Sequence, residues 1–177
     1  MKYLVVSDIH GSADWLKKFI KVSKSENPDK IIILGDVYYH GPRNALPDGY
    51  SPMAVAEMLN SVADSIVCVK GNCDAEVDQM ISKFEMMEKY EEEISYKKFL
   101  FVHGHHLDFQ NLPNGYDFIF GGHTHESGIT DFGGVVYVNP GSLSIPKNGT
   151  TNSYSKIENE KITILDFNGK VIDEIKI

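Results

Sequence analysis

Short apolar runs recur along the chain, and each is rich in β-branched or aromatic residues. Six of them stand out, at residues 3–6, 31–34, 66–69, 99–102, 118–120 and 135–138. Runs of this length that end in polar or glycine residues are typical of strands buried on both faces. The pattern therefore predicts six core strands.

Helical patterns separate the first of these runs. Ser12 can cap a helix whose apolar face contains Trp15, Leu16, Phe19 and Ile20. A second helix is predicted to begin at Ser51 and Pro52, because proline is favoured in the first helical turn. Strands that alternate with helices favour parallel pairing. We expect a parallel sheet in the first half of the chain.

The second half has a different pattern, in which predicted strands follow one another without a convincing helix. Near the end, residues 162–167 and 171–177 flank Asn168 and Gly169, a pair typical of a hairpin with a type I′ turn. We therefore predict an α/β protein of two packed sheets with outer helices. We expect a single domain over residues 1–177.

Composition narrows the class of protein. The chain has 177 residues, 42% of them hydrophobic, which is enough for a sizeable core. Its net charge of −8 argues against an extended nucleic-acid-binding surface.

No apolar run approaches the roughly 20 residues that span a bilayer, and the first run reaches Asp8 too soon for a signal peptide. The two cysteines are too few for a disulfide framework. We predict a cytoplasmic protein without a membrane partner, and the sequence leaves homo-oligomer formation open.

Polar side chains follow the predicted strands, at the point where each strand ends. Residues able to bind a metal occupy five of the six strand ends, namely Asp8, His10, Asp36, Asn72, His103, His123 and His125. Carboxyl ends of parallel strands form the ligand-binding edge of α/β sheets. Asp8 and His10 are two positions apart, as are His123 and His125, which places each pair on one side of an extended segment.

These residue types favour a particular metal chemistry. Carboxylates, imidazoles and an amide oxygen suit Mn, Fe, Zn or Ni better than Ca, and the thiolates of a structural zinc site are missing. Seven ligands are too many for one ion with an open position, but they suit two ions that share a carboxylate. Such a site stays electropositive, attracts a phosphate ester, and can generate hydroxide while holding both the attacking and the leaving oxygen.

Other residues are candidates for substrate binding or proton transfer. Arg43 lies in a Gly- and Pro-rich stretch over residues 37–50, where a guanidinium could bind two phosphate oxygens or form an ordinary surface ion pair. His40 is a second candidate for substrate contact. Cys73 and Asp74 follow Asn72 directly, and His105 could face the substrate.

The ordered set of motifs resembles the signature of the calcineurin-like metallophosphoesterases. The matching pieces are Asp8-x-His10, Gly35-Asp36, Gly71-Asn72-x-Asp74, His103-Gly104-His105 and Gly122-His123-x-His125. Residues 36–44, 71–74 and 139–142 further resemble the small YfcE-type phosphodiesterases. The resemblance implies a four-layer α/β/β/α sandwich of two mixed sheets flanked by helices.

The resemblance also implies a ligand assignment and a cofactor. Two divalent ions, often manganese, would be held, with Asp36 shared between them. One would be bound by Asp8, His10 and His125 and the other by Asn72, His103 and His123.

The chain departs from the larger phosphatases of this family at one position. They have a histidine, paired with an acid, that is thought to protonate the leaving group, where this chain has Cys73. A thiol with a pKa of about 8.5 is a poorer proton donor. Cys73, Asp74 and His105 are therefore the candidates for this catalytic step.

We predict a phosphodiesterase that hydrolyses a small diester by attack of a hydroxide bridging two divalent metals. The alternatives are a phosphomonoesterase, a non-catalytic scaffold with the same fold, and a redox or storage metal protein. Assays of both ester types on metal-loaded protein separate them.

Overall fold

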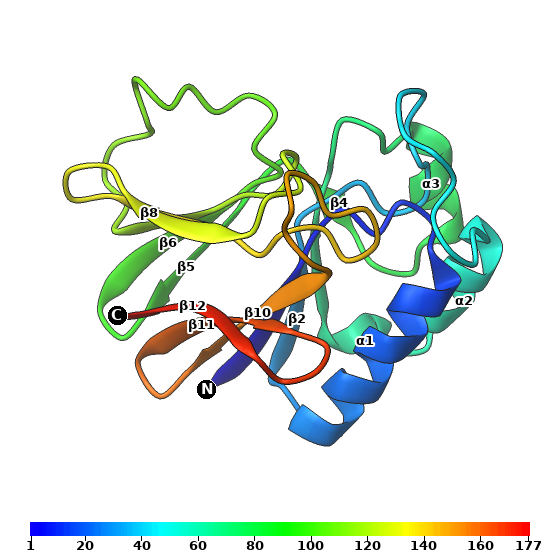
Figure 1. Ribbon diagram of the computed structural model, residues 1–177, viewed down its shortest axis with the longest axis horizontal. Coiled ribbons are helices and arrows are strands. Elements are labelled where there is room, and N and C mark those ends of the chain that lie inside the picture. Colours follow the sequence, from blue (N-terminus) through cyan, green and yellow to red (C-terminus); the bar gives the residue numbers. More distant parts are fainter.

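The computed structural model describes residues 1–177 and contains two mixed β-sheets (Figure 1). The larger sheet has the strand order β12-β11-β10-β1-β2-β3-β4, and β1 pairs in parallel with β2, which pairs in parallel with β3. The parallel pairing predicted for the first half of the chain is confirmed. The strands of this sheet are β1 (Lys2–Val6), β2 (Lys30–Ile33), β3 (Ile66–Val69), β4 (Met86–Met87), β10 (Ser153–Glu158), β11 (Lys161–Asp166) and β12 (Val171–Lys176).

The smaller sheet has the order β5-β6-β7-β9-β8 and a parallel centre formed by β6, β7 and β9. All six strands predicted from the apolar runs are present in the two sheets. The strands of this sheet are β5 (Tyr90–Ile94), β6 (Lys97–Phe101), β7 (Phe118–Phe120), β8 (Gly128–Asp131) and β9 (Val136–Asn139).

The helices all come before residue 82 and cover the larger sheet (Figure 1). They are α1 (Ala13–Glu26), α2 (Pro52–Asn60), the 3-10 turn Ala63–Ser65 and α3 (Glu76–Ile81). Ser12 caps α1 as predicted, because its hydroxyl accepts a hydrogen bond of 3.4 Å from the Trp15 amide. None of these helices is both long and apolar enough to cross a bilayer.

Strand alternation divides the core into layers. In β1, Leu4 and Val6 face the helices, whereas Tyr3 and Val5 face the smaller sheet. Aromatic residues of the smaller sheet complete the layer between the sheets, where the rings of Phe99 and Phe118 stack with centroids 4.7 Å apart. Alternation of this kind buries both faces of a strand at once.

The outer face of the smaller sheet is covered without a helix. Leu100, Ile119 and Tyr137 form its apolar surface, and side chains of Leu107 and Leu112 from the irregular segment 102–117 pack on it. The α/β class and the two mixed sheets are therefore confirmed, but the fourth layer is an irregular segment instead of the expected helix.

The C-terminal hairpin forms as predicted, with a different turn. A type I′ turn needs positive φ at both central residues, but only Gly169 has it, with φ of 83°, while Asn168 does not. The Asp166 carboxylate accepts hydrogen bonds from the amides of Asn168 and Lys170 at 2.8 and 2.9 Å. This side-chain cap stabilises a turn with one left-handed glycine.

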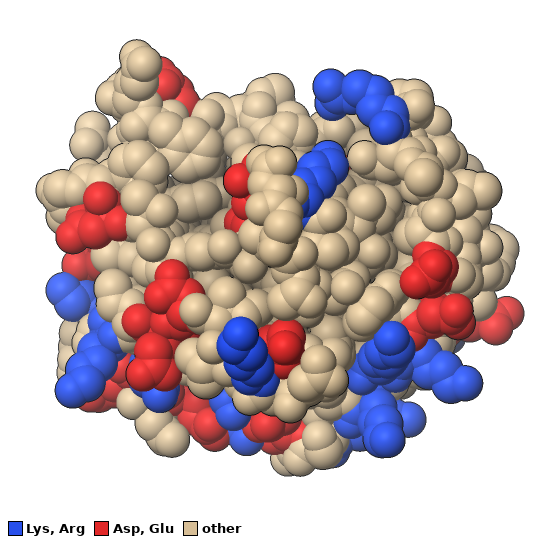
Figure 2. All heavy atoms as spheres, in the orientation of Figure 1, with Lys and Arg blue, Asp and Glu red and all other residues tan.

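Charged side chains are spread unevenly over the face seen in Figure 2. Lys, Arg, Asp and Glu gather along its lower part, with both signs interspersed, while the upper part is mostly uncharged. This face therefore has no continuous basic band.

Candidate metal centre

The loops that follow β1, β2, β3, β6 and β7 meet at one edge of the two sheets. All seven predicted metal ligands lie on these loops, and side-chain or backbone contacts connect them. Parallel strands in both sheets explain the convergence, because their carboxyl ends share an edge.

Asp8, His10 and His125 form one close cluster. The distance from Asp8 Oδ1 to Nε2 is 3.6 Å for His10 and 3.3 Å for His125, and the two Nε2 atoms are 3.2 Å apart. Ligand atoms bound about 2.1 Å from a tetrahedral ion lie about 3.4 Å from one another. The three atoms therefore have the spacing of three corners of a coordination polyhedron.

Asp36 connects this cluster to a second one. Its Oδ2 lies 3.7 Å from Nε2 of His10 and 3.4 Å from Nε2 of His103, whose Nε2 is also 3.0 Å from Oδ1 of Asn72. The other carboxylate oxygen of Asp36 accepts a hydrogen bond of 2.7 Å from the Cys73 amide. This bond orients the carboxylate so that one oxygen faces both clusters.

His123 is less closely integrated than the other predicted ligands. Its backbone amide donates to Asp8 Oδ2 at 3.0 Å, and its ring centroid lies 5.2 Å from that of His103. Its ring nitrogens belong to none of the close metal-binding groups. The His123 ring therefore lies beside the second cluster, but its nitrogens are not part of a close group of ligand atoms.

Backbone carbonyls fix the orientation of three imidazoles. Nδ1 of His10, His103 and His125 faces the carbonyl oxygens of Tyr39, Leu34 and Ile145 at 2.7, 2.6 and 2.6 Å. A hydrogen bond of this kind places the proton on Nδ1 and leaves the Nε2 lone pair directed at the cluster. Such an outer contact is common for histidines that bind metals.

Left-handed backbone conformations are concentrated at this edge. Five of the seven predicted ligands have φ between 49° and 66°, namely Asp8, His10, Asp36, His123 and His125. The two-residue spacing was expected to act through an extended segment, and that expectation is wrong. Left-handed residues cost about 1–3 kcal/mol each and persist only when surrounding contacts impose them, as at functional sites.

Residues 139–142 contact the loops that have these left-handed conformations. Asn139 Nδ2 donates to the carbonyl of Gly122 at 3.0 Å, and Ser142 Oγ donates to the carbonyl of Asp8 at 2.8 Å. Gly122 itself packs so closely that a Cβ there would overlap the side chains of Ser7 and Asp8. The 139–142 motif was visible in the sequence, but its partners are distant in the chain.

The electrostatics of the cluster suit a divalent cation. Burial opposes ionisation of Asp8, but contacts with His10 and His125 outweigh it and hold the pKa of the carboxyl well below its ordinary value. Burial opposes protonation of His103, but the negative charges of Asp36 and Asp8 outweigh this effect and raise its pKa to about 9. The cluster therefore stabilises positive charge. Asp8 Oδ1 is fully buried and has no hydrogen-bond partner. A buried, unpartnered carboxylate oxygen among imidazoles fits a metal ligand.

Asp74 lines the cavity at the ligand cluster, and its carboxylate is bound by backbone amides of two loops. Oδ2 accepts hydrogen bonds from the amides of Asp36 and Gly71 at 2.8 and 2.7 Å, and Oδ1 accepts one from Val37 at 2.8 Å. The side chain is buried, and burial raises its pKa against the effect of these amides. Asp74 therefore joins the loops after β2 and β3, and its catalytic role stays a prediction.

Cys73 and Arg43 line a cavity of about 770 Å³ together with His10, Asp36, Asn72, His123 and His125. The Cys73 thiol is close to His10 Nε2 and the Asp36 carboxylate. Burial and the neighbouring Asp36 raise the pKa of this thiol to about 12. Cys73 therefore faces the cavity as a neutral thiol, and Arg43 is exposed at its rim without an ion-pair partner.

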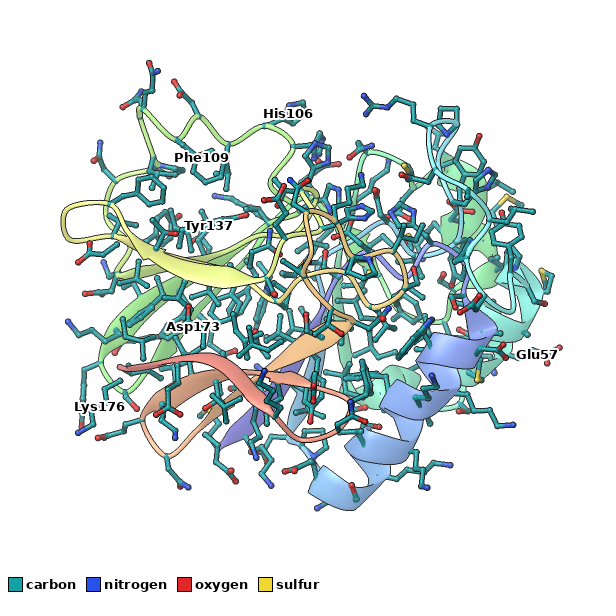
Figure 3. All side chains as sticks on the ribbon, viewed as in Figure 1. Glu57, His106, Phe109, Tyr137, Asp173 and Lys176 are labelled. Atoms are coloured by element: carbon teal, nitrogen blue, oxygen red, sulfur yellow. The ribbon has the colours of Figure 1, made fainter.

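His40 and His105 lie outside this cavity. The His40 ring packs edge-on against Tyr39 and Tyr50, with centroids 4.8 and 5.3 Å away. His105 lines a separate hollow of about 110 Å³ beside Lys70, while His106 projects outward at the top of Figure 3. The His105 ring nevertheless lies beside two predicted metal ligands, with its centroid 5.3 Å from that of His103 and 6.1 Å from that of His123. The substrate contacts of His40 and His105 therefore stay predictions.

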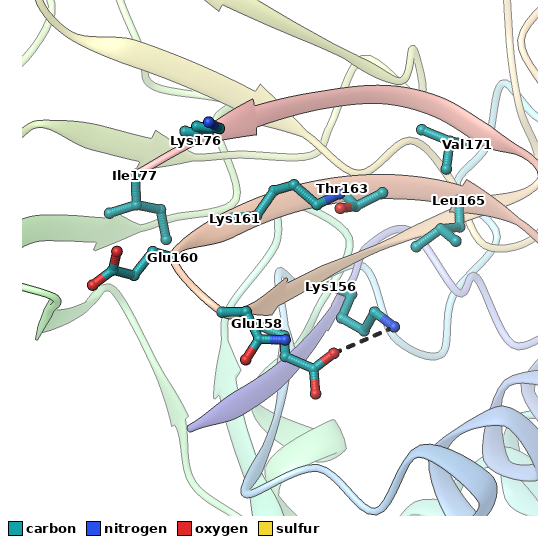
Figure 4. A pocket seen from close by; sticks show the side chains of 10 residues that line it. Lys156, Glu158, Glu160, Lys161, Thr163, Leu165, Val171, Lys176 and Ile177 are labelled. Atoms are coloured by element: carbon teal, nitrogen blue, oxygen red, sulfur yellow. Dashed lines mark ion pairs between the residues drawn. The ribbon is translucent and has the colours of Figure 1, made fainter.

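Another hollow lies on the open face of β10, β11 and β12 (Figure 4). Its charges are mixed, and Lys156 forms an ion pair of 3.6 Å with Glu158. Basic and acidic groups that neutralise one another do not form an anion site. The cavity at the ligand cluster remains the candidate site.

Comparison with known proteins agrees with this arrangement. The family model for the calcineurin-like phosphoesterase superfamily domain matches residues 1–161. The protein named phosphodiesterase YfcE from Escherichia coli strain K12 is 41% identical, with 97% of this chain and 95% of that protein covered. The protein named probable metallophosphoesterase YsnB from Bacillus subtilis is 31% identical, with 99% and 97% covered.

A solved structure of the E. coli protein, described as a phosphoesterase, superposes closely. Its TM-score is 0.96 at 36% identity, with 99% of each chain covered. The two-sheet architecture and the strand-end loops of this chain are thus those of a known fold. The chain belongs to the calcineurin-like phosphoesterase superfamily.

Proposed function

We propose that this chain is a metal-dependent phosphodiesterase that hydrolyses a small diester. The observation that carries the proposal is the Asp36 carboxylate at the cavity, whose Oδ2 lies 3.7 Å from Nε2 of His10 and 3.4 Å from Nε2 of His103. The printed name of the E. coli relative, phosphodiesterase, supports the same reaction.

The protein's own residues have distinct parts in this proposal. Asp8, His10 and His125 would hold one divalent ion, and Asp36, Asn72 and His103, with the adjacent His123, the other. When bound, the ions would supply Lewis acidity and lower the pKa of water. Arg43, at the cavity rim, would hold non-bridging phosphate oxygens through its planar guanidinium.

A diester suits the cavity better than a monoester. Its volume of about 770 Å³ falls within the range of about 300–1,000 Å³ typical of sites for molecules much larger than phosphate. Space remains for two ester groups beside the phosphate. The Cys73 thiol, with its raised pKa, would give little help to a poor leaving group, so esters with good leaving groups should react fastest.

Two finer assignments belong to the proposal. We propose manganese as the metal, because the candidate donors are imidazole nitrogens and carboxylate or amide oxygens without a required thiolate. We also propose a cytoplasmic location, because Cys68 and Cys73 are both free thiols. The mixed charges of the face in Figure 2 support a small substrate over a nucleic-acid duplex.

The test is hydrolysis by purified protein whose metal content is measured in parallel. With manganese, bis(p-nitrophenyl) phosphate should be cleaved with a higher kcat/KM than p-nitrophenyl phosphate, and chelation should abolish cleavage. Arg43→Ala should raise KM or lower kcat without loss of metal. Lys170→Ala, which removes an exposed cation in the distant hairpin turn, is its control.

Each alternative function has its own outcome. Faster cleavage of the monoester would favour a phosphomonoesterase. Metal-loaded protein that cleaves neither ester would support a scaffold or a storage role and would refute the proposed activity.

A further inference from the structure

One aromatic side chain is exposed at the cavity, beside the predicted metal ligands. Tyr39 is 42% exposed, and it is the sole Phe, Tyr or Trp among the residues that line the cavity. Pro42 and Ala75 also line the cavity, whose other contributors are mostly polar or charged. An exposed aromatic ring at a cavity offers a flat surface on which a planar group of a ligand can stack.

The Tyr39 backbone is tied directly to the ligand cluster. Its carbonyl oxygen faces Nδ1 of His10 at 2.7 Å. The position of the ring is therefore coupled to the imidazole that, in the proposed function, binds a metal. An ester held at the cluster would have Tyr39 as a fixed neighbour.

Neighbouring aromatic rings also pack around Tyr39. His40 packs edge-to-face against Tyr39 at an interplanar angle of 70°, and Tyr50 packs edge-to-face against His40 at 82°. Asn44 Nδ2 donates to the His40 carbonyl at 2.8 Å, and Tyr50 forms a β-bridge with Ser12. These contacts hold the exposed ring in place, so that stacking on it would require little further ordering.

Two cations at the cavity can bind an anion next to the ring, although the carboxylates Asp36, Asp74 and Glu126 line it as well. Arg43 and Lys147 both line the cavity, and neither has an ion-pair partner in the structure. The cavity therefore combines cations for a phosphate with one aromatic surface for a neighbouring group. A simple alkyl diester would leave that surface exposed to water.

We infer that Tyr39 is a specificity-determining residue that stacks on a planar aromatic group of the substrate, a nucleobase or an aryl ring, in the ester arm that is not the leaving group. This inference rests on the proposed phosphodiesterase function. Stacking on an aromatic side chain is worth about fivefold or more in affinity per ring.

The experiment uses substrates with a common leaving group and different second arms. Methyl p-nitrophenyl phosphate, phenyl p-nitrophenyl phosphate and thymidine 5′-(p-nitrophenyl phosphate) all release p-nitrophenolate, so differences in KM report the second arm. We expect KM for the phenyl or thymidine ester to be about fivefold or more below that for the methyl ester. A preference for thymidine alone would identify the nucleobase as the natural group, and equal preferences would indicate any planar ring.

Two variants test whether the Tyr39 ring causes the preference for aromatic esters. Tyr39→Leu, which keeps the backbone carbonyl and apolar bulk, should reduce the KM ratio between methyl and aromatic esters to about one, whereas Tyr39→Phe should preserve it. The control is Tyr96→Leu in the turn between β5 and β6, where the tyrosine is 95% exposed. Manganese content should remain the same in all variants.

The outcomes separate the two proposals. Failure of the wild-type protein to cleave any of the three diesters would refute the proposed phosphodiesterase function itself. Cleavage of all three with equal KM, or an aromatic preference that survives in Tyr39→Leu, would overturn the stacking role and leave the phosphodiesterase function intact.

Discussion

The structural role of Asp74 in joining the loops after β2 and β3 can be tested by Asp74→Asn, which keeps the size of the side chain and removes one acceptor. The carboxylate accepts hydrogen bonds from three buried backbone amides, those of Asp36, Val37 and Gly71, at 2.7–2.8 Å. An asparagine oxygen can replace Oδ2 and keep two of these bonds. The asparagine NH₂ group then faces the Val37 amide, so that two donors oppose each other.

The expected cost follows from that single mismatch. A buried donor left without an acceptor costs about 1–3 kcal/mol. We expect Asp74→Asn to lower the free energy of unfolding by this amount. Asp74→Ala should cost more, because all three amides lose their acceptor. Since Asp74 joins the loops that carry Asp36 and Asn72, we also expect weaker metal binding.

Urea unfolding in the presence of a chelator measures the first effect, and metal content after dialysis measures the second. Asp64→Asn is a matched control, because Asp64 is exposed and makes no side-chain hydrogen bond. A stability change for Asp74→Asn below about 0.5 kcal/mol, the range of ordinary surface substitutions, would refute the reasoning. Lost turnover with unchanged stability and metal content would instead support the predicted catalytic role of Asp74.

Three further outcomes are expected. Asp36→Asn should lower the occupancy of both metal sites, and elemental analysis that finds two ions still bound would contradict the shared role. Gly122→Ala should reduce stability and metal binding because its Cβ overlaps Ser7, whereas Gly128→Ala, with open space around it, should have little effect on thermal unfolding. Burial raises the pKa of Glu92, but hydrogen bonds from lysine and tyrosine outweigh it and lower the pKa below 4.5. Its stabilising contribution is therefore complete above that pH and is lost as the pH falls through the lowered pKa, so wild type and Glu92→Gln should differ more in urea unfolding at pH 7 than at pH 3.

Local sequence patterns were sufficient to predict most of the strands, the start of the first helix and the residue types of the candidate site. The apolar runs predicted the strands because β-branched and aromatic residues pack well on both faces of a buried strand. Ser12 predicted the start of α1 because its hydroxyl satisfies a free amide of the first turn. The ligands were identifiable because they follow the strands in order, and a strand end is a local feature.

Tertiary structure decided what those residues contact. The sequence shows that Asp74 adjoins Asn72, but its hydrogen-bond partners Asp36 and Val37 come from another loop. The His40 ring packs against Tyr39 and Tyr50 and does not line the cavity, whereas the neighbouring Tyr39 does. The sequence determined which chemical groups stand at the strand ends, because strand formation depends on nearby residues. Only folding decided their directions and neighbours, because these depend on contacts between loops that are far apart in the chain.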